Sequence, residues 1–351
     1  MPILKKNMSP SVDIFVLHKN GEDIIKNFLE SLKKTDYPNY NVFILLYEST
    51  DKSEEIIKRY NVKMLKSKIN LGFTGGCIKL LNYSMKHTKS KYFALLNDDM
   101  EVDKNWLKEL VNFAEKNNIS ICSSKILTLK EKDKFDHGGA AGCFIDKYGY
   151  PFCRGRIFNN LEKDRGQYDN AIQVFYASGG GMLVNKDLVK KIGFLDKDYF
   201  AYCEEVDFCW RANMAGEKIF FVPTSKVYHL GHFTFKKEKW MSRKEYMLHR
   251  NTLITFFKNY SSASLVKLFI PRMLFEIISG IIFFPAKTIA IIKSFGYIIF
   301  NIKDIVKKRR EVQKLRKVND AELKKIIYQK SIIWEHFVKG RKEFPKDFLK
   351  N

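Results

Sequence analysis

The sequence lacks several features that define special classes of protein. Its six cysteines form no Cys-x-x-Cys pair, which disfavours a zinc-ribbon or thioredoxin-type site. No uncharged apolar stretch reaches the roughly 18 residues of a membrane-spanning helix. The first ten residues contain no apolar core of a secretory signal, and internal repeats are absent. The 351 residues are 45% apolar, which is enough for an ordinary folded core in about two domains.

Acidic residues are scarce towards the C-terminus. The chain has 62 Lys and Arg against 39 Asp and Glu, a formal charge of +23, and residues 231–351 hold 27 of the basic and 10 of the acidic residues. Within 277–302, apolar stretches are interrupted by single lysines, and a basic cluster follows at once. This pattern favours helices on an anionic membrane surface, with a helical subdomain packed on the main body, or a membrane span, as the alternatives. The cluster comprises Lys303, Lys307, Lys308, Arg309, Arg310, Lys314, Arg316 and Lys317.

Nucleic acid is the other partner that a basic surface attracts. The basic cluster lacks interleaved aromatic residues and any known reader motif, so we expect no nucleic-acid partner. The scattered cysteines are typical of a reduced, cytosolic protein. We therefore expect a cytoplasmic protein bound peripherally to the inner face of the cell membrane.

Apolar runs alternate with segments of helical spacing in the first part of the chain. This rhythm predicts an α/β domain with a largely parallel sheet, whose ligands sit beyond the carboxyl ends of the strands. The predicted strands cover 12–17, 42–46, 62–65, 92–96 and 119–123, and the predicted helices cover 23–34, 53–60, 78–85 and 106–115.

The rest of the chain is less regular. Residues 135–166 are rich in glycine and aromatics, and we expect loops over a site there, including a mobile one. Predicted helices cover 187–192 and 199–212. Short strands follow at 219–222 and 227–229, and helices from about 240 to the end. The pattern predicts a main domain over 1–239 and a basic helical membrane-associating extension over 240–351.

Two motifs could bind a charged ligand. Asn97-Asp98-Asp99 follows an apolar strand, and adjacent carboxylates there suit a hard divalent cation, although Asn and Asp also favour caps and turns. The Gly-rich run over 71–76 precedes the predicted helix, where free backbone N–H groups suit a phosphate or sugar oxygen. It matches neither the Walker A loop nor the dinucleotide-binding signature.

A cluster of acids and a histidine could carry further chemistry. Asp207 and Arg211 are spaced as an i,i+4 pair that supports a helix. Glu205 has no such partner, because the residue four positions on is Cys209, so it is a candidate general base or a solvated surface acid. His229 follows a short strand and fits either a metal ligand or a hydrogen-bonded structural residue.

The order of these motifs resembles glycosyltransferase family 2, in particular its rhamnosyltransferase-like branch. The resemblance covers about residues 10–235, and the basic tail is also similar to that branch. Its motifs are Asn70-x-Gly-Phe-x-Gly-Gly76, Leu95-Leu-Asn-Asp-Asp99, Gly179-Gly-Gly-Met-Leu-Val184, Gly193-Phe-Leu-Asp196, Tyr202-x-Glu-Glu-Val-Asp-Phe-Cys-Trp-Arg211, Val222-Pro and Val227-Tyr-His229.

The resemblance implies an α/β protein of the GT-A fold, with a Rossmann-like mixed sheet and a C-terminal helical extension. It implies inverting transfer of a sugar such as rhamnose from a dTDP- or UDP-sugar to a polyprenyl-linked or cell-surface glycan acceptor. A divalent cation, Mn²⁺ or Mg²⁺, would be the cofactor. The alternative is a degenerate member that binds nucleotide-sugar or glycan without catalysis.

The resemblance also assigns roles to single residues. Asp99 and His229 match the metal positions, and Glu205 matches the acidic base, with Glu204 beside it. At the catalytic-base position, where this chain has Glu205, the family usually has Asp. At the position that binds the nucleotide base, where this chain has Leu46, the family also usually has Asp. The donor-side positions are Leu17, His18, Glu48, Asp51, Gly72, Gly75, Gly76, Asn97 and Asp98, and the acceptor-side positions are Gly179, Gly180, Trp210 and Arg211.

Overall fold

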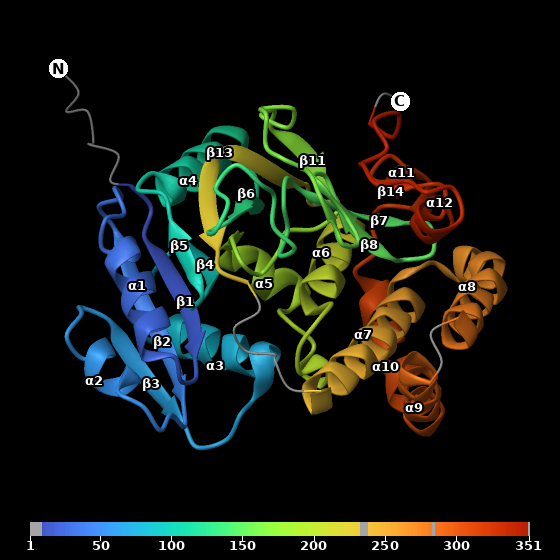
Figure 1. Ribbon diagram of the computed structural model, residues 1–351, viewed down its shortest axis with the longest axis horizontal. Coiled ribbons are helices and arrows are strands. Elements are labelled where there is room, and N and C mark those ends of the chain that lie inside the picture. The colour runs from blue at the N-terminus through green and yellow to red at the C-terminus, as the bar shows by residue number, and fades with distance from the viewer. Residues whose placement is uncertain (1–8, 232–237, 283–284, 350–351) are drawn as a thin grey trace.

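A mixed β-sheet forms the centre of the protein (Figure 1). The computed structural model describes residues 9–231, 238–282 and 285–349. The strands of the sheet are β1 (Val12–His18), β2 (Tyr40–Tyr47), β3 (Lys63–Ser67), β4 (Tyr92–Asn97), β5 (Met100–Val102), β6 (Ile121–Thr128), β11 (Ile172–Val174), β12 (Met182–Asn185) and β13 (Ile219–His229).

The sheet has the order β11-β13-β6-β12-β4-β1-β2-β3, and β5 pairs with β13. β3, β2, β1 and β4 run parallel, as do β6 and β13. β12 lies between β4 and β6 and is antiparallel to both, which makes the sheet mixed. The expected strand runs are confirmed, but β13 is one continuous strand with an irregularity between Val222 and Lys226, where we expected two strands.

Helices cover both faces of the sheet. α1 (Glu22–Leu32), α2 (Ser53–Ile57) and α4 (Trp106–Asn117) bury their apolar sides against one face. α3 (Gly72–His87), α5 (Lys186–Ile192) and α6 (Glu204–Met214) cover the other. Alternate side chains of the strands belong to the two cores, Ile14 and Val16 to one and Phe15 to the other. The α/β prediction is therefore confirmed.

Two helices begin elsewhere than expected. α3 begins at Gly72, so the Gly-rich run lies inside its first turn and does not precede the helix. Glycine is needed there, because a Cβ on Gly76 would lie 2.7 Å from a methyl group of Leu17, and Gly72 has a φ of +70°. α6 begins at Glu204, five residues after the expected start, because Tyr202 and Cys203 have positive φ and cannot continue a helix.

A second, smaller sheet occupies part of the segment 135–166 that we expected to be loops, so that prediction was wrong for the strands between 143 and 161. Its strands are β7 (Cys143–Asp146), β8 (Pro151–Cys153), β9 (Arg156–Ile157), β10 (Asn160–Leu161) and β14 (Ile327–Tyr328), in the order β10-β9-β8-β7-β14. The rings of Phe344 and Phe348 pack 5.6 and 5.2 Å from that of Phe144. The aromatic side chains of this layer therefore belong to the buried core.

The C-terminal region is helical as predicted only as far as α10. α7 (Glu238–Asn259), α8 (Ser262–Ile282), α9 (Ala286–Phe300) and α10 (Ile302–Lys314) form one side of the molecule, with α8 and α9 outermost (Figure 1). Beyond them lie only the short helices α11 (Asp320–Leu323) and α12 (Ile332–Phe337) and strand β14. Because β14 pairs in parallel with β7, the end of the chain is built into the main body. None of the helices in the described ranges combines the length and apolar content needed to cross a bilayer.

Candidate active site

The carboxyl ends of β1 and β4 place two polar residues side by side. The strands are parallel neighbours, so His18 and Asp98 end at the same edge of the sheet. His18 Nδ1 lies 2.6 Å from Asp98 Oδ2, and His18 Nε2 lies 2.8 Å from Ser53 Oγ. Burial raises the pKa of the Asp98 carboxyl, and the bond to His18 opposes that rise. Asp98 is thus held by the protein, and its neighbour Asp99 faces elsewhere.

Asp99 meets His229 because of a strand pairing. Residue 100 of β5 lies opposite residue 229 of β13, and the backbone N–H of Leu230 donates to Asp99 O at 2.9 Å. This register brings Asp99 Oδ1 to 3.2 Å from His229 Nε2. The other ring nitrogen, Nδ1, lies 2.8 Å from Asp136 Oδ1. The carboxylates of Asp99 and Asp136 thus hold the His229 ring from both sides and fix its orientation. Asp136 was not among the residues that the sequence pointed to.

The two carboxylates of this trio stabilise a positive charge between them. Burial lowers the pKa of His229, but the hydrogen bonds and charges of Asp136 and Asp99 outweigh it and raise the pKa to about 10. His229 thus carries a positive charge between two carboxylates. A divalent cation bound at Asp99 would displace the proton on Nε2, while Asp136 keeps the Nδ1 proton and the ring orientation.

Asp99 and His229 offer two ligands for a divalent cation and would leave part of its coordination open. Within the described ranges, no group of three or more His, Cys, Asp or Glu side chains is placed to hold a metal ion. Asp99 and His229 give one carboxylate oxygen and one imidazole nitrogen, which leaves positions for phosphate oxygens. An ion here would be shared between the protein and its ligand.

Two adjacent glutamates open helix α6. Glu204 is buried, its Oε2 has no hydrogen-bond partner within the described residues, and burial raises its pKa well above the ordinary value. Glu205 is half-buried, and burial raises its pKa to about 7. Asp207 in the same turn differs, because Lys258 and Arg211 together outweigh the effect of its burial and lower its pKa. Glu205 is thus the partly exposed acid of this turn whose raised pKa suits proton exchange near neutral pH.

Close backbone contacts draw the surrounding loops together. The Thr74 N–H donates to Phe200 O at 3.1 Å, which ties the start of α3 to the loop before α6. A Cβ on Gly179 would lie 2.9 Å from the Phe73 ring, and one on Gly180 would lie 3.6 Å from Asn97 Nδ2. The glycines of both predicted motifs therefore let four segments converge at one edge of the sheet.

The donor-side residues divide into two groups. Glu48 is exposed directly after β2, whereas Leu46 is buried in the core, so Glu48 is the first acid available there. Asp51 accepts backbone N–H bonds from Gly21 at 2.6 Å and Glu22 at 3.1 Å, and another from Ser53 at 3.1 Å. These bonds join the starts of α1 and α2, so Asp51 stabilises the fold at this point.

The two side chains expected on the acceptor side are part of the core, and that prediction was wrong. Trp210 is fully buried, with its ring 5.3 Å from that of Phe175 and 4.7 Å from that of Tyr260. Arg211 Nε donates to Asp207 Oδ2 at 3.0 Å, and its Nη1 donates to Ile192 O at 2.8 Å. The predicted i,i+4 pair is confirmed, and it braces α6 against the segment after α5.

A family profile decides the classification. The profile described as Glycosyl transferase family 2 matches residues 13–193, which is more than half of the chain. The chain belongs to glycosyltransferase family 2. The match ends before Glu204, so the roles of Glu205 and His229 rest on the geometry above.

Two relatives of the chain are named as sugar transferases. The low-salt glycan biosynthesis hexosyltransferase Agl10 of Haloferax volcanii is 23% identical over 60% of this chain and 64% of its own. The rhamnosyltransferase WbbL of Escherichia coli is 23% identical over 68% of this chain and 96% of its own. This glycosyltransferase thus spans slightly less than two thirds of the first relative.

The fold agrees with this membership. A crystal structure of GalNAc-T7 with UDP, GalNAc and Mn²⁺ superposes with a TM-score of 0.57 at 15% identity, over 75% of this chain and 50% of that one. The predicted GT-A fold, with a mixed α/β sheet and a helical C-terminal region, is confirmed.

Proposed function

We propose that this family 2 glycosyltransferase moves a sugar from a nucleoside-diphosphate donor to a glycan acceptor, with inversion at the anomeric carbon. The observation that carries the proposal is the pairing of Asp99 Oδ1 with His229 Nε2 at 3.2 Å, on the sheet edge where the loop of Glu205 also converges. One part of the site thus receives a diphosphate, and the other receives a proton.

The donor would lie along the carboxyl ends of β1, β2 and β4. A divalent cation held by Asp99 and His229 would offset the charge that develops on the departing diphosphate. Asp136 orients His229, and His18 holds Asp98 inward so that Asp99 faces the ligand. Glu48, exposed after β2, is placed to receive the nucleoside.

Glu205 would act at the acceptor. Its carboxylate accepts the proton of the acceptor hydroxyl as that oxygen attacks the anomeric carbon on the face opposite the diphosphate. A pKa of about 7 makes it both ionised in part and basic enough at neutral pH. A single displacement of this kind inverts the anomeric configuration.

The relatives support a choice of substrates without deciding it. WbbL is named a rhamnosyltransferase, and the GalNAc-T7 structure holds UDP, so we propose a dTDP- or UDP-sugar donor, with rhamnose as the first candidate. A polyprenyl-linked glycan is the proposed acceptor, because such a molecule would lie in the membrane that the C-terminal helices are suited to contact.

The outer faces of α8 and α9 support this membrane contact (Figure 1). Ile270 and Ile281 of α8 are 67% and 71% exposed, and Phe300 of α9 is 90% exposed. Lys267 and Lys293 are exposed among them. An apolar face with lysines is complementary to an anionic lipid surface, so we propose that the enzyme binds the inner face of the cell membrane peripherally.

The inner face of α8 explains how such a surface stays fixed to the body. Arg272 and Glu276 are fully buried and lie 2.8 Å apart, and Glu276 Oε2 lies 2.6 Å from His249 Nδ1 of α7. Arg272 and Glu276 both belong to α8, so the contact of Glu276 with His249 is the link to α7. Buried charged groups lose stability when a partner is removed, so this contact holds α8 on α7 while the other side of α8 remains apolar and exposed.

A panel of donors tests the proposed reaction. The full chain is mixed with Mn²⁺ and with UDP-, dTDP- or GDP-sugars, and release of nucleoside diphosphate is measured with and without membrane extract as acceptor. We expect release from one donor class, a product of inverted configuration by NMR, and loss of turnover in Glu205→Gln. Nucleotide binding without release from any donor would favour the degenerate alternative, and a product of retained configuration would contradict the mechanism.

A further inference from the structure

One face of α7 carries buried polar side chains, which are directed at α6 and at the segment that leads into it. Buried helix faces are normally apolar, because a polar group loses its water on burial and must find partners in the protein. Nothing in the spacing of these residues distinguishes them from a solvated helix face. They are Arg250, Asn251, Thr255, Lys258 and Asn259.

The central member of this polar face is Asn251, which is 0% exposed. Its Nδ2 donates to two successive backbone carbonyls, Ala201 O at 2.9 Å and Tyr202 O at 2.7 Å. Arg250 Nη2 donates to Asp198 O at 2.9 Å, and Thr255 Oγ1 lies 2.7 Å from the Tyr199 hydroxyl. The polar face of α7 thus holds the loop 198–202 at several consecutive points.

The loop that is held has an unfavourable backbone. Phe200, Tyr202 and Cys203 have φ values of +40°, +72° and +66°, in the left-handed region that favours glycine. A non-glycine residue keeps this backbone conformation only when contacts with the surrounding structure hold it there. Glu205 follows directly, in the first turn of α6, so the direction of its carboxylate depends on this backbone.

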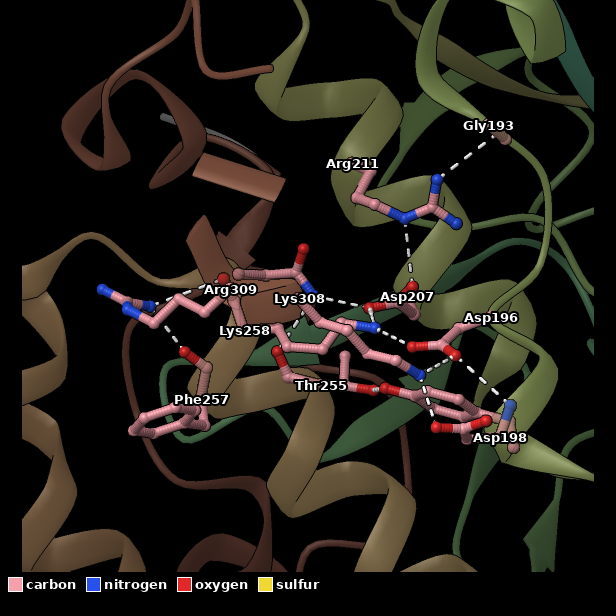
Figure 2. Close-up of polar contacts among 12 residues, drawn as sticks. Gly193, Asp196, Asp198, Asp207, Arg211, Thr255, Phe257, Lys258, Lys308 and Arg309 are labelled. Carbon is pink, nitrogen blue, oxygen red and sulfur yellow. Dashed lines mark hydrogen bonds and ion pairs between the residues drawn. The ribbon is translucent and has the colours of Figure 1, made fainter. Parts of the chain in front are cut away.

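A network of ion pairs also holds the start of the loop to α7 and α10 (Figure 2). Lys258 Nζ lies 2.7 Å from Asp196 Oδ2 and 3.1 Å from Asp207 Oδ1. Lys308 of α10 pairs with the other oxygen of Asp196 and lies 2.6 Å from Asp198 Oδ2. The network therefore joins α7 and α10 to both ends of the segment 196–207.

We infer that the polar face of α7, with Asn251 at its centre, positions Glu205 by holding the strained backbone of residues 200–203. Asn251 is a positioning residue, since it contacts the loop and not the reacting atoms. This inference rests on the proposed function only in treating Glu205 as the base. The hold on the loop itself is a separate physical claim.

Removing the side chain of Asn251 has two consequences. Tyr202 and Cys203 can relax from the left-handed region, which moves the start of α6 and hydrates Glu205. Hydration lowers the pKa of Glu205, because burial is what raises it. The titratable side chains near Glu205 are Glu204, Cys77, Cys153, Tyr176, Cys203 and Cys209.

The test compares the full chain with Asn251→Ala and with a matched control, Asn213→Ala. Asn213 is also buried in this region and donates to a single backbone carbonyl, Phe175 O at 2.8 Å, and among the described residues it makes no hydrogen bond to the strained loop. Thr255→Val is a milder variant that keeps the shape and removes only the hydroxyl bonded to Tyr199. The readouts are amide exchange over 200–206, donor turnover against pH, and UDP affinity with Mn²⁺.

We expect Asn251→Ala to speed amide exchange in 200–206 by about tenfold or more, and Thr255→Val to do so to a smaller extent. Turnover should fall by about 10- to 100-fold, because a shift of about 1 Å in a catalytic group has that effect. The acid limb of the pH profile should move to lower pH, with UDP affinity within about twofold of wild type. The control should show none of these changes.

The inference is overturned if exchange in 200–206 is the same in Asn251→Ala and wild type, or if Asn213→Ala loses turnover to the same extent. An unmoved acid limb would assign Asn251 to stability alone. If the wild type turns over no donor, the proposed function fails, and the exchange measurement still decides whether α7 holds the loop. Should Asn251→Ala not fold, Thr255→Val decides by the same criteria.

Discussion

Replacing Glu205 by Gln should abolish transfer and make the folded chain more resistant to heat. Glu205 is half-buried at the start of α6, beside the buried Glu204, and no ion pair to it is found within the described residues. Burial therefore raises its pKa from 4.5 to about 7. The amide keeps the shape of the side chain but neither ionises nor accepts the acceptor proton.

The direction of the pKa shift fixes the pH dependence of both effects. Below pH 4.5 the carboxyl is protonated in the folded and the unfolded chain. Between pH 4.5 and about 7 the unfolded chain ionises first, so stability falls with rising pH and stays reduced above pH 7. The ionised, active fraction is about one tenth at pH 6, one half at pH 7 and nine tenths at pH 8.

Thermal unfolding at pH 4.5 and pH 8, together with the pH profile of donor turnover, measures both effects. We expect Glu205→Gln to unfold at a higher temperature than wild type at pH 8 and at the same temperature at pH 4.5. Glu55→Gln, at an exposed glutamate of α2, is the matched control and should change neither value. A wild-type acid limb near pH 4.5, or turnover retained in Glu205→Gln, would refute the reasoning.

Three further outcomes follow from named contacts. Asp136→Asn should weaken Mn²⁺ binding by about 10- to 100-fold, since it orients His229; calorimetry with UDP present measures this, and an unchanged affinity would remove Asp136 from the site. Changing Ile270 and Ile281 together to Asp should release the enzyme from vesicles of anionic lipid in a flotation assay, whereas continued binding would show that α8 is not the contact surface. Asp51→Ala should cost about 1–3 kcal/mol in denaturant unfolding, because three backbone N–H groups lose their acceptor, and unaltered stability would contradict its structural task.

The sheet core could be predicted because each of its strands and helices shows its character in the adjacent residues of the sequence. β1, β2 and β4 are apolar runs of ordinary length, and helices such as α1 have a clear apolar stripe. The Asp98-Asp99 pair could be placed at a strand end for the same reason. The GT-A fold and the family followed from the order of the motifs.

Other features depend on contacts between distant parts of the chain. Strands β9 and β10 are two residues long, too short for any periodicity, and β14 pairs with β7, to which it is not adjacent in sequence. Asp136 reaches His229 across 93 positions. In the sequence, the buried polar face of α7 looks the same as a solvated surface. The pattern of residues does not show which polar groups find partners in the protein interior.

Calorimetric binding of UDP, dTDP and GDP, with and without Mn²⁺, tests the central claim most directly. The measurement compares wild type with Asp99→Ala and uses Glu101→Ala, two residues away on β5, as the matched control. The account predicts that one nucleotide binds only with Mn²⁺, that Asp99→Ala abolishes this binding, and that Glu101→Ala retains it. Binding that is indifferent to Mn²⁺, or unchanged in Asp99→Ala, would contradict the donor site described here.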